Sequence, residues 1–468
     1  MKYRMRMLAV HHHQLRELLS DTSKEQGCFL LCSHASSDDE TVLLVNKVVP
    51  LFEQDFVVQK YNQLSVSPSA MLRVAREAQK LNCSICMVHT HPMSHGEVAF
   101  SRADDIGNID TFAFFNRMLS DQPNSCLVWD AELKHVEGRV YKSSNTNWEL
   151  INFVEVVSGE QRLVFSSSSN TNLVDEQFNR QAKLLGAEGQ FALKKLHIGV
   201  VGCGGIGSIA SSLLAHSGIS QITLIDFDVT EKTNLPRILG ATPNDVFSQL
   251  LKVDVAKRYI NQHAPETLVH THSLPIEHED ILKSLVTLDI IICGTDDTTS
   301  RAFLNQLCHQ YYVPILDLGV QFVADEVTGE LVKEIGRVHL MRPSSACMLC
   351  TGDINSKRLA DEGLTPDDIS RRLAEGYIAN SDISEPSMMV FNMQVAARGV
   401  QHLISWVTGL SPVAEEQYEQ YRFFGLTTFA GIKQIKKRTI DHCPVCSSSS
   451  TILGNGDLQK MWVKPRPT

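Results

Sequence analysis

Residues 198–218 constrain the fold of this 468-residue chain more than any other stretch. They read IGVVGCGGIGSIASSLLAHSG: an apolar run, a glycine cluster and then a helical pattern. The glycines are Gly202, Gly204, Gly205 and Gly207, three of them spaced G-x-G-x-x-G. Glycines let the backbone approach a phosphate, and the helix that follows presents its N-terminus to an anion. The stretch therefore predicts a strand, a phosphate-binding loop and a helix.

The second half of the chain alternates apolar runs with helical patterns. The runs HIGVVG, QITLIDFD, LDIIICGTDD and VPILDLGV are separated by helical spans such as 206–216 and 249–262. Continuous apolar runs of this length are typical of strands buried on both faces, so the alternation predicts a parallel α/β sheet. Residues 198–225 carry no charge, but their clustered glycines argue against a membrane helix.

Charged residues directly follow these apolar runs, at positions that commonly contact a bound nucleotide. Asp226 and Asp228 end the second run, and an acid about 20 residues beyond the glycines commonly holds a ribose hydroxyl. That pattern alone also fits a dinucleotide-dependent oxidoreductase. Cationic side chains near the loop favour a triphosphate, and a strand-end carboxylate such as Asp296 suits Mg²⁺. The neighbouring polar and cationic candidates are Asn234, Arg237 and Lys252.

In this order, these motifs resemble the ThiF/MoeB/HesA family, the Rossmann-like core of ubiquitin-activating-type enzymes, from about residue 176 to residue 446. We expect the corresponding domain to span residues 176–468. The resemblance implies that Asp226 binds ribose and that Asp296 holds Mg²⁺. It also implies a homodimer, in which Arg180 contacts the ATP phosphates across the interface in some members. The residues that would face the phosphates are Asn234, Arg237 and Lys252. The implied reaction is adenylation of a ubiquitin-like or sulfur-carrier protein ending in Gly-Gly.

Two CxxC pairs close this half of the chain. Cys347-x-x-Cys350 and Cys443-x-x-Cys446 supply four thiolates, the ligand set of a closed structural zinc site. Residues 351–442 contain no cysteine. Thioester-forming members of the family carry a cysteine there, so we expect adenylation without an enzyme thioester.

The first half contains the stretch CMVHTHPMSHGEVAFSRADD, residues 86–105. Side chains two apart on a strand share a face, so His89 and His91 can bind one metal ion. A helix restarting at Ser101 brings a carboxylate as third ligand, from Asp104 or from Asp105. Ser101-x-x-Asp104 is also an ordinary helix-capping pattern.

The spacing HxHP followed by Ser-x-x-Asp resembles the JAB/MPN (JAMM) metalloprotease family, over roughly residues 5–150. We expect an α+β domain at residues 1–155. The resemblance implies a catalytic zinc held by His89, His91 and Asp104. It also implies that Glu25 is the general base and that Ser101 stabilises the oxyanion. A Ser/Asn-rich stretch at 156–175 is expected to be a linker.

Together the two halves predict an enzyme that cleaves after the C-terminal glycine of a ubiquitin-like protein and adenylates that terminus. Maturation and deconjugation both fit the cleavage. The alternatives are an NAD(P)-dependent oxidoreductase with an accessory domain and a non-catalytic scaffold. The net charge of −10 and the absence of a dense Lys/Arg block argue against nucleic acid. We see no signal peptide and expect a cytoplasmic protein without membrane contact.

Overall fold

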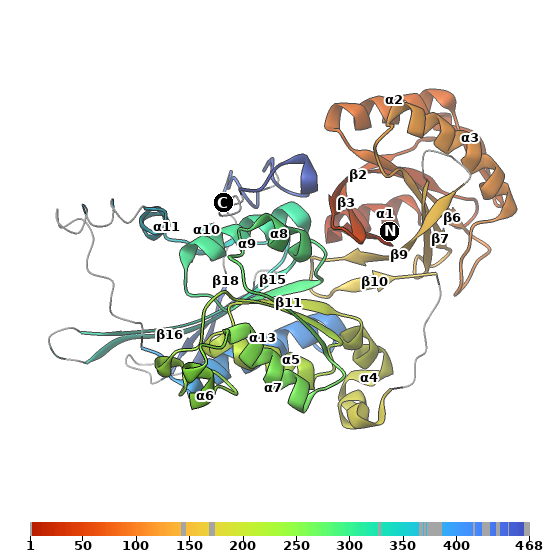
Figure 1. The fold of residues 1–468 in the computed structure, drawn as a ribbon. Helices are drawn as coiled ribbons and strands as arrows, with labels where there is room; N and C mark the ends of the chain where they lie inside the picture. The colour runs from red at the N-terminus through yellow and green to blue at the C-terminus, as the bar shows by residue number, and fades with distance from the viewer. Residues whose placement is uncertain are drawn as a thin grey trace. The chain divides into compact units, whose positions relative to one another are not determined.

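The structure, a computed structural model, is drawn in Figure 1. It describes residues 2–141, 147–167, 174–325, 328, 330–364, 368, 371, 386–414, 417–423, 431–436, 440–447 and 449–462. The chain folds into two compact units. Unit 1 comprises Met1–Asn172, Gln310–Tyr312 and Thr451–Lys460, and unit 2 comprises Leu173–His309, Val313–Ser450 and Met461–Thr468.

Unit 1 is built on an eight-stranded sheet with the order β1-β3-β2-β6-β7-β8-β9-β10. β1 also pairs in parallel with β9, so the two sides of the sheet come together. A separate hairpin of β4 and β5 forms a two-stranded sheet. The strands are β1 (Lys2–Met7), β2 (Gly27–Ser36), β3 (Glu40–Pro50), β4 (Phe56–Lys60), β5 (Gln63–Val66), β6 (Ser84–His91), β7 (Ser125–Asp130), β8 (Val136–Tyr141), β9 (Trp148–Val156) and β10 (Leu163–Phe165).

Local sequence sets the ends of the unit 1 helices. The Ser67 hydroxyl accepts a hydrogen bond from the Ala70 amide at 3.3 Å, Pro68 occupies the first helical position, and Asn82 ends the helix in the left-handed region. Phe112 and Phe115 are fully buried in a core shared with β2 and β6, and burying each stabilises the fold by roughly 2–3 kcal/mol. The helices are α1 (Ala9–Leu18), α2 (Pro68–Leu81) and α3 (Arg102–Met118), with a 3₁₀ turn η1 (Glu53–Asp55).

Unit 2 is built on a second eight-stranded sheet, with the order β13-β12-β11-β14-β15-β16-β17-β18. Its first five strands are parallel and the last three are antiparallel additions. Numbered from β11, the parallel order is 3-2-1-4-5, which reverses between β11 and β14, where such sheets bind ligands. The strands are β11 (His197–Val201), β12 (Gln221–Ile225), β13 (Leu268–His272), β14 (Ile290–Cys293), β15 (Ile315–Ala324), β16 (Leu331–Met341), β17 (Gln417–Arg422) and β18 (Gly431–Lys436).

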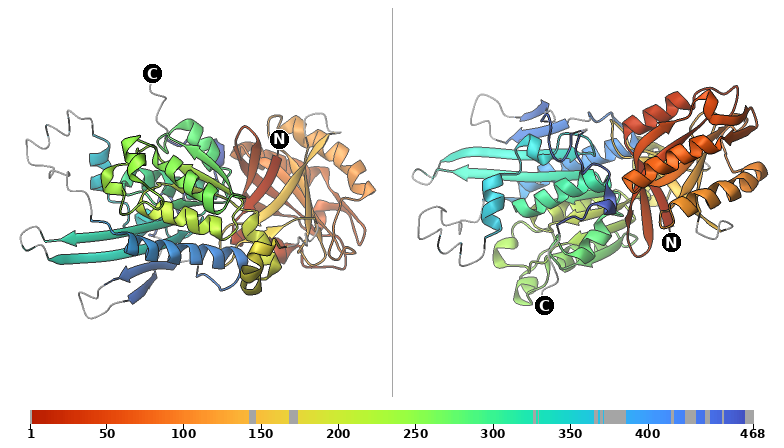
Figure 2. Two further views of the ribbon diagram at one scale, coloured as in Figure 1. Left: turned by 60° about the horizontal axis from the view of Figure 1, so that its bottom comes forward. Right: turned by 90° about the horizontal axis from the view of Figure 1, so that it is seen from above.

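Helices cover both faces of this sheet. Figure 1 shows α5, α7 and α13 on one face and α8 and α9 on the other, and Figure 2 shows α13 running beside β15 and β16. The helices are α4 (Asn179–Lys194), α5 (Gly205–His216), α6 (Pro243–Phe247), α7 (Lys252–His263), α8 (Glu279–Leu285), α9 (Thr298–Tyr311), α10 (Met348–Thr351), α11 (Ser356–Glu362) and α13 (Met389–Thr408). Short 3₁₀ turns are η2 (Glu176–Phe178), η3 (Lys232–Asn234) and, in unit 1, η4 (Gly456–Leu458).

The parallel α/β sheet expected from the sequence is confirmed, and α5 and α7 match the expected helical spans. Two boundaries differ from our expectation. β10 lies inside the span 156–175 and pairs with β9, so the strand pairing of unit 1 continues past residue 155. Thr451–Lys460, which we grouped with the second half, belongs to unit 1. None of the helices in the described ranges has both the length and the apolar character that a membrane crossing requires.

Candidate functional site

A cavity of about 940 Å³ opens in unit 2 where the strand order reverses. It is lined by residues at the carboxyl ends of β11, β12 and β14, the edge at which open α/β sheets bind ligands. Most of the residues expected to bind a nucleotide line it: Gly202, Gly204, Gly205, Asp226, Asp228, Arg237, Lys252 and Asp296. The sheet topology thus gathers residues that are up to 94 positions apart (296 − 202) in one place.

The glycines of this loop differ in what a side chain would meet there. Gly202 turns the chain with φ +84°, a conformation that residues with a side chain rarely adopt. A Cβ at Gly207 would lie 1.8 Å from the Gly202 carbonyl oxygen, so this position admits only glycine without movement. A Cβ at Gly204 would meet nothing within 4 Å, because Gly204 faces open space. The loop therefore leaves its backbone accessible to a ligand.

Two acids follow β12 and organise the loop. The Asp226 carboxylate accepts hydrogen bonds from the backbone amides of Cys203 at 2.7 Å and Asp228 at 2.9 Å. Burial raises the pKa of Asp226, and the nearby Lys252 and these amides oppose the rise. Lys252 in turn pairs with Asp228 at 2.6 Å. Asp228 therefore holds the Lys252 ammonium at the cavity wall. The phosphates of a bound nucleotide carry more negative charge than one carboxylate and can replace Asp228 as the partner of Lys252.

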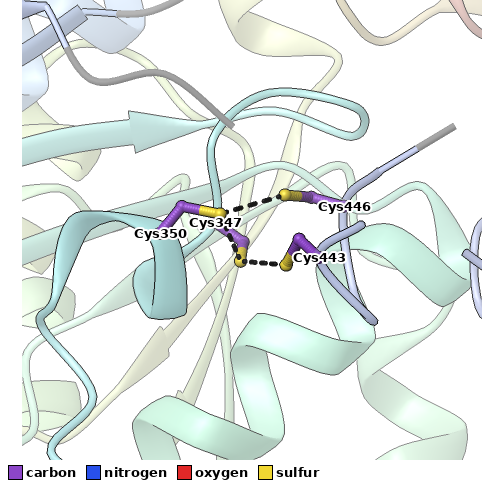
Figure 3. Close-up of side chains that lie close together, drawn as sticks. All are labelled: Cys347, Cys350, Cys443 and Cys446. Atoms are coloured by element: carbon purple, nitrogen blue, oxygen red, sulfur yellow. Dashed lines mark hydrogen bonds between the residues drawn. The ribbon is translucent and has the colours of Figure 1, made fainter. Parts of the chain in front are cut away.

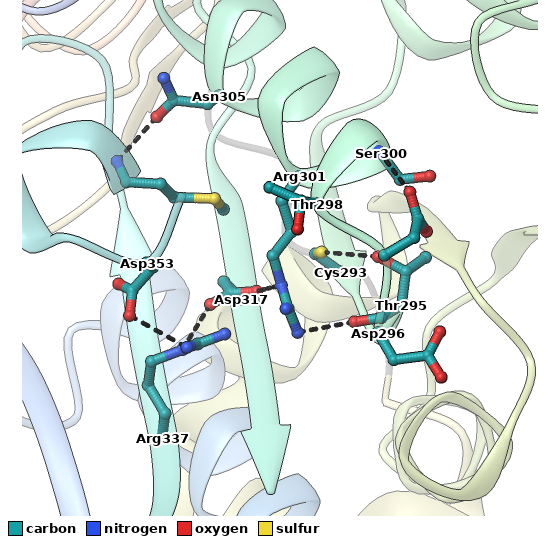
Figure 4. Close-up of polar contacts among 12 residues, drawn as sticks. Cys293, Thr295, Asp296, Thr298, Ser300, Arg301, Asn305, Asp317, Arg337 and Asp353 are labelled. Atoms are coloured by element: carbon teal, nitrogen blue, oxygen red, sulfur yellow. Dashed lines mark hydrogen bonds and ion pairs between the residues drawn. The ribbon is translucent and has the colours of Figure 1, made fainter. Parts of the chain in front are cut away.

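Three further residues of the cavity lining, Arg301, Arg337 and Asp353, belong to a mostly buried ion network (Figure 4). Asp317 on β15 accepts from Arg337 on β16 at 2.8 Å and lies 3.4 Å from Arg301 on α9. Arg337 also donates to Asp353 at 2.9 Å, and Arg301 donates to the carbonyl of Thr295 at 2.7 Å. Burial raises the pKa of Asp317, but the two arginines outweigh it and leave that pKa below its usual value. We did not single out these residues from the sequence, although a charge inside the apolar run VPILDLGV was a signal.

Three of the predicted residues do not line the cavity. Gly207 belongs to the loop but faces the Gly202 carbonyl, and the other two lie elsewhere in the described structure. Arg180 is exposed on α4 and does not line the cavity of its own chain. Asn234 is buried in η3, where its side-chain oxygen accepts from the Glu231 amide at 3.0 Å, and it also does not line the cavity. Roles for both in phosphate binding remain predictions.

The two CxxC pairs meet in unit 2 (Figure 3). Their sulfur atoms are separated by 3.8 Å (Cys347–Cys350), 3.7 Å (Cys347–Cys443) and 3.5 Å (Cys350–Cys446). A tetrahedron with Zn–S bonds of about 2.3 Å has S···S edges of about 3.8 Å, so the four thiols fit a zinc ion. Contacts with the neighbouring thiols lower the pKa of Cys347 to about 5, and the Ile440 amide donates to the Cys350 sulfur at 3.2 Å.

The two histidines of β6 meet the first turn of α3 in unit 1. His89 Nε2 lies 3.2 Å from one Asp104 oxygen, and His91 Nε2 lies 3.2 Å from the other. These separations are close to the edge of a tetrahedron with metal–ligand bonds of about 2.0 Å, roughly 3.3 Å. His89 Nδ1 is buried without a hydrogen-bond partner in the described part of the chain, and the buried Nε2 faces the Asp104 carboxylate without an aligned hydrogen bond. The set therefore fits a metal ion, and the site would keep a fourth position open.

Arg139 distinguishes the two candidate carboxylates. Its guanidinium pairs with Asp105 at 2.6 Å and is stacked between the rings of Phe100 and Trp148, at 4.3 and 4.1 Å from their centroids. Asp105 is thereby held away from the histidines, whereas Asp104 faces both of them. Asp104 is thus the carboxylate of this cluster.

Glu25 and Ser101 are the two remaining residues expected at the metal site of unit 1. Glu25 is 4% exposed, and burial, reinforced by Asp104 and opposed by His91, raises its pKa to about 7. Ser101 caps α3: its hydroxyl accepts from the Asp104 amide at 3.2 Å, and its own amide donates to Asp104 at 2.7 Å. The capping pattern and the metal-type cluster therefore share Asp104, and the cap orients its carboxylate.

The fold and the cavity of unit 2 define a Rossmann-like α/β protein with a glycine-rich phosphate loop. The sequence matches the ThiF family over residues 178–445, more than half of the chain, and the chain belongs to this family.

Curated relatives match a smaller portion of the chain. It is similar to the "Adenylyltransferase and sulfurtransferase MOCS3" of Culex quinquefasciatus, with 36% identity over 134 residues, 28% of this chain and 30% of that one. It is also similar to a "Molybdopterin-synthase adenylyltransferase" of Haemophilus influenzae, with 32% identity over 143 residues, 30% and 58% of the two chains. The matched part is thus less than two thirds of either relative. The solved structure of MccB from E. coli aligns with a TM-score of 0.46 at 22% identity, over 60% of this chain and 74% of that chain.

Proposed function

We propose that unit 2 adenylates the C-terminal carboxylate of a ubiquitin-like or sulfur-carrier protein that ends in Gly-Gly, using ATP and Mg²⁺. The observation that carries this proposal is the cavity at the strand-order reversal, which combines the glycine loop with Asp226, Arg237, Lys252 and Asp296. Membership of the ThiF family and the adenylyltransferase relatives support the same reaction class.

The reaction joins a carboxylate oxygen of the protein to the α-phosphorus of ATP and releases pyrophosphate. Arg237 and Lys252 would stabilise the charge that develops on the phosphates, and Asp226 would hold the ribose. Mg²⁺ bound at Asp296 would neutralise the leaving pyrophosphate. Since residues 351–442 contain no cysteine, we propose that the adenylate is the product released to an acceptor, without an enzyme thioester.

A homodimer is part of the proposal, because Arg180 is exposed outside its own cavity. In an interface that brings two copies together, Arg180 would enter the cavity of the partner. Mixing two inactive variants, Arg180→Ala and Lys252→Ala, tests this: restored activity requires the residues to work in trans.

Pyrophosphate exchange tests the adenylation. The full chain is incubated with ATP, labelled pyrophosphate and a candidate carrier ending in Gly-Gly. Exchange should require the carrier, fall at least a hundredfold in Lys252→Gln, and persist in Lys257→Gln, a control on the same helix outside the cavity lining. NAD reduction without exchange would instead support the oxidoreductase alternative.

A second function is favoured by the cluster in unit 1. We propose that His89, His91 and Asp104 hold a catalytic zinc and that unit 1 cleaves the peptide or isopeptide bond after the C-terminal glycine of the same carrier. Zinc would supply a water molecule of lowered pKa. Glu25 would accept a proton from the attacking water and pass it to the leaving amine, and Ser101 would donate to the oxyanion.

Metal content and cleavage test this second function. The wild-type chain should contain two zinc ions per molecule, and His89→Ala should contain one, lose cleavage of a carrier with a C-terminal extension, and keep pyrophosphate exchange. His95→Ala is the control, because His95 lies in the loop after β6 with a side chain 65% exposed. Loss of both activities in His89→Ala with the fold intact would contradict two independent sites. A chain with neither activity supports the scaffold alternative.

A further inference from the structure

Helix α11 forms one wall of the nucleotide cavity through three residues, Asn355, Arg358 and Glu362. Its position is set locally. The Asn355 side chain caps it by accepting from the amides of Lys357 at 2.9 Å and Arg358 at 3.2 Å. Arg358 and Glu362 are four residues apart, so they lie on one side of the helix and pair at 3.2 Å.

Both side chains reach the loop between β14 and α9, which carries Asp296. From the start of α9, Glu362 accepts three hydrogen bonds: from the Thr298 amide at 2.9 Å, and from the Thr299 amide and hydroxyl at 2.8 Å each. Arg358 donates to the carbonyl oxygen of Asp296 at 3.0 Å. The two residues thus hold the loop at Asp296 itself and at the start of α9, directly after Asp297.

These contacts favour the charged form of Glu362. Amides in the first turn of α9 lack partners within the helix, and a carboxylate satisfies them and complements the positive helix end. Burial raises the pKa of Glu362, but the hydrogen bonds from Thr298 and Thr299 outweigh it and leave that pKa below its usual value. Glu362 is therefore ionised at neutral pH and bound to the loop.

We propose that Glu362 and Arg358 are positioning residues for Asp296: they fix the loop so that the Asp296 carboxylate meets the Mg²⁺ that accompanies ATP. This inference rests on the proposed adenylation and adds to it two residues outside the glycine loop and strand ends. In this proposal, α11 orients the Asp296 carboxylate toward the metal ion. The helix itself does not contact the reacting atoms.

Nucleotide binding with and without Mg²⁺ tests the inference. Isothermal titration of the full chain with ATP in excess Mg²⁺ should show roughly tenfold weaker binding for Glu362→Ala, with Glu362→Gln in between, because glutamine keeps one acceptor. In EDTA the variants should match the wild type within about twofold, since Asp296 acts through the metal. Lys357→Ala, an exposed change on the same helix, should match the wild type in both conditions.

Hydrogen exchange supplies a readout that needs no nucleotide. The amides of Thr298 and Thr299 should exchange at least tenfold faster in Glu362→Ala, while the melting temperature stays within about 2 °C. Equal loss of affinity with and without Mg²⁺, unchanged affinity, or tighter binding would each overturn the positioning role. If the wild type binds no ATP, the proposed adenylation fails, and unchanged exchange separately refutes the contact of Glu362 with the loop.

Discussion

Replacing Gly207 by alanine places a methyl carbon 1.8 Å from the carbonyl oxygen of Gly202. Cβ atoms in proteins essentially never approach another heavy atom closer than 3.0 Å, so the two groups must separate by at least 3.0 − 1.8 = 1.2 Å. The obstacle is backbone, and Gly202 already uses a left-handed conformation. The strain therefore cannot be relieved by turning a side chain.

The cost follows from this geometry. Overpacking a folded site typically costs about 1–3 kcal/mol, and a clash with backbone belongs at the upper end, so we expect roughly 3 kcal/mol for Gly207→Ala. For a unit of this size that loss lowers the melting temperature by roughly 6–12 °C. ATP affinity should fall as well, because the displaced loop is the phosphate-binding loop.

Gly204→Ala is the matched control. Gly204 has φ −74°, and a Cβ there meets nothing within 4 Å, so stability should change by less than about 0.5 kcal/mol. The added methyl group nevertheless occupies the space where we expect the phosphates, and ATP affinity should fall at least tenfold. Gly207→Ala thus tests the effect of the loop on stability, and Gly204→Ala tests its effect on ATP binding alone.

Differential scanning fluorimetry and isothermal titration with Mg²⁺ and ATP, both on the full chain, provide the assay. A Gly207→Ala chain that melts within about 2 °C of the wild type would refute the steric reasoning. A Gly204→Ala chain that binds ATP like the wild type would refute the placement of phosphates at the loop.

Three further outcomes follow from other parts of the structure. Cys347→Ser should remove one zinc and lower the stability of unit 2 in urea unfolding, without a selective loss of one chemical step. Asp317→Asn should lower the free energy of unfolding by about 3 kcal/mol in the same assay, because it removes the buried negative charge that pairs with two mostly buried arginines. Burial lowers the pKa of His309 to about 3 and of His339 to about 4. Below about pH 6.5 these histidines therefore take up protons in the unfolded chain but stay neutral in the folded one. As the pH falls from 7.5 to 5, each should lower the free energy of unfolding by roughly 2 kcal/mol, measured by urea unfolding. A free energy of unfolding that does not change over this range would argue against their burial as neutral groups.

Periodicity was enough to predict the main elements of both sites. Alternation along β6 placed His89 and His91 on one face, and the alternation of strands with helices predicted the parallel sheet. It could not choose between Asp104 and Asp105, because both lie in the first turn of α3. That choice depends on Arg139, which lies 34 residues further along the chain and pairs with Asp105.

Other features depend on contacts that no local pattern encodes. Asn234 follows the ribose acid in sequence, but the structure uses it to cap η3, since capping residues and phosphate-facing residues have the same polar character. Glu362 carries no motif at all. Its place at the start of α9 follows from the packing of α11, which is 64 residues away in sequence (362 − 298).

The segment Thr451–Lys460 has a consequence for how the protein is made. It packs on strands near the start of the chain: the Ser36 amide donates to Asp457 at 2.9 Å, and a Cβ at Gly456 would collide with the His34 carbonyl. During synthesis on a ribosome, most of unit 1 therefore emerges first but lacks a piece that is translated only after most of unit 2. Its final packing must wait until residues 451–460 have been made, and no single cut in the gene yields a complete copy of either half.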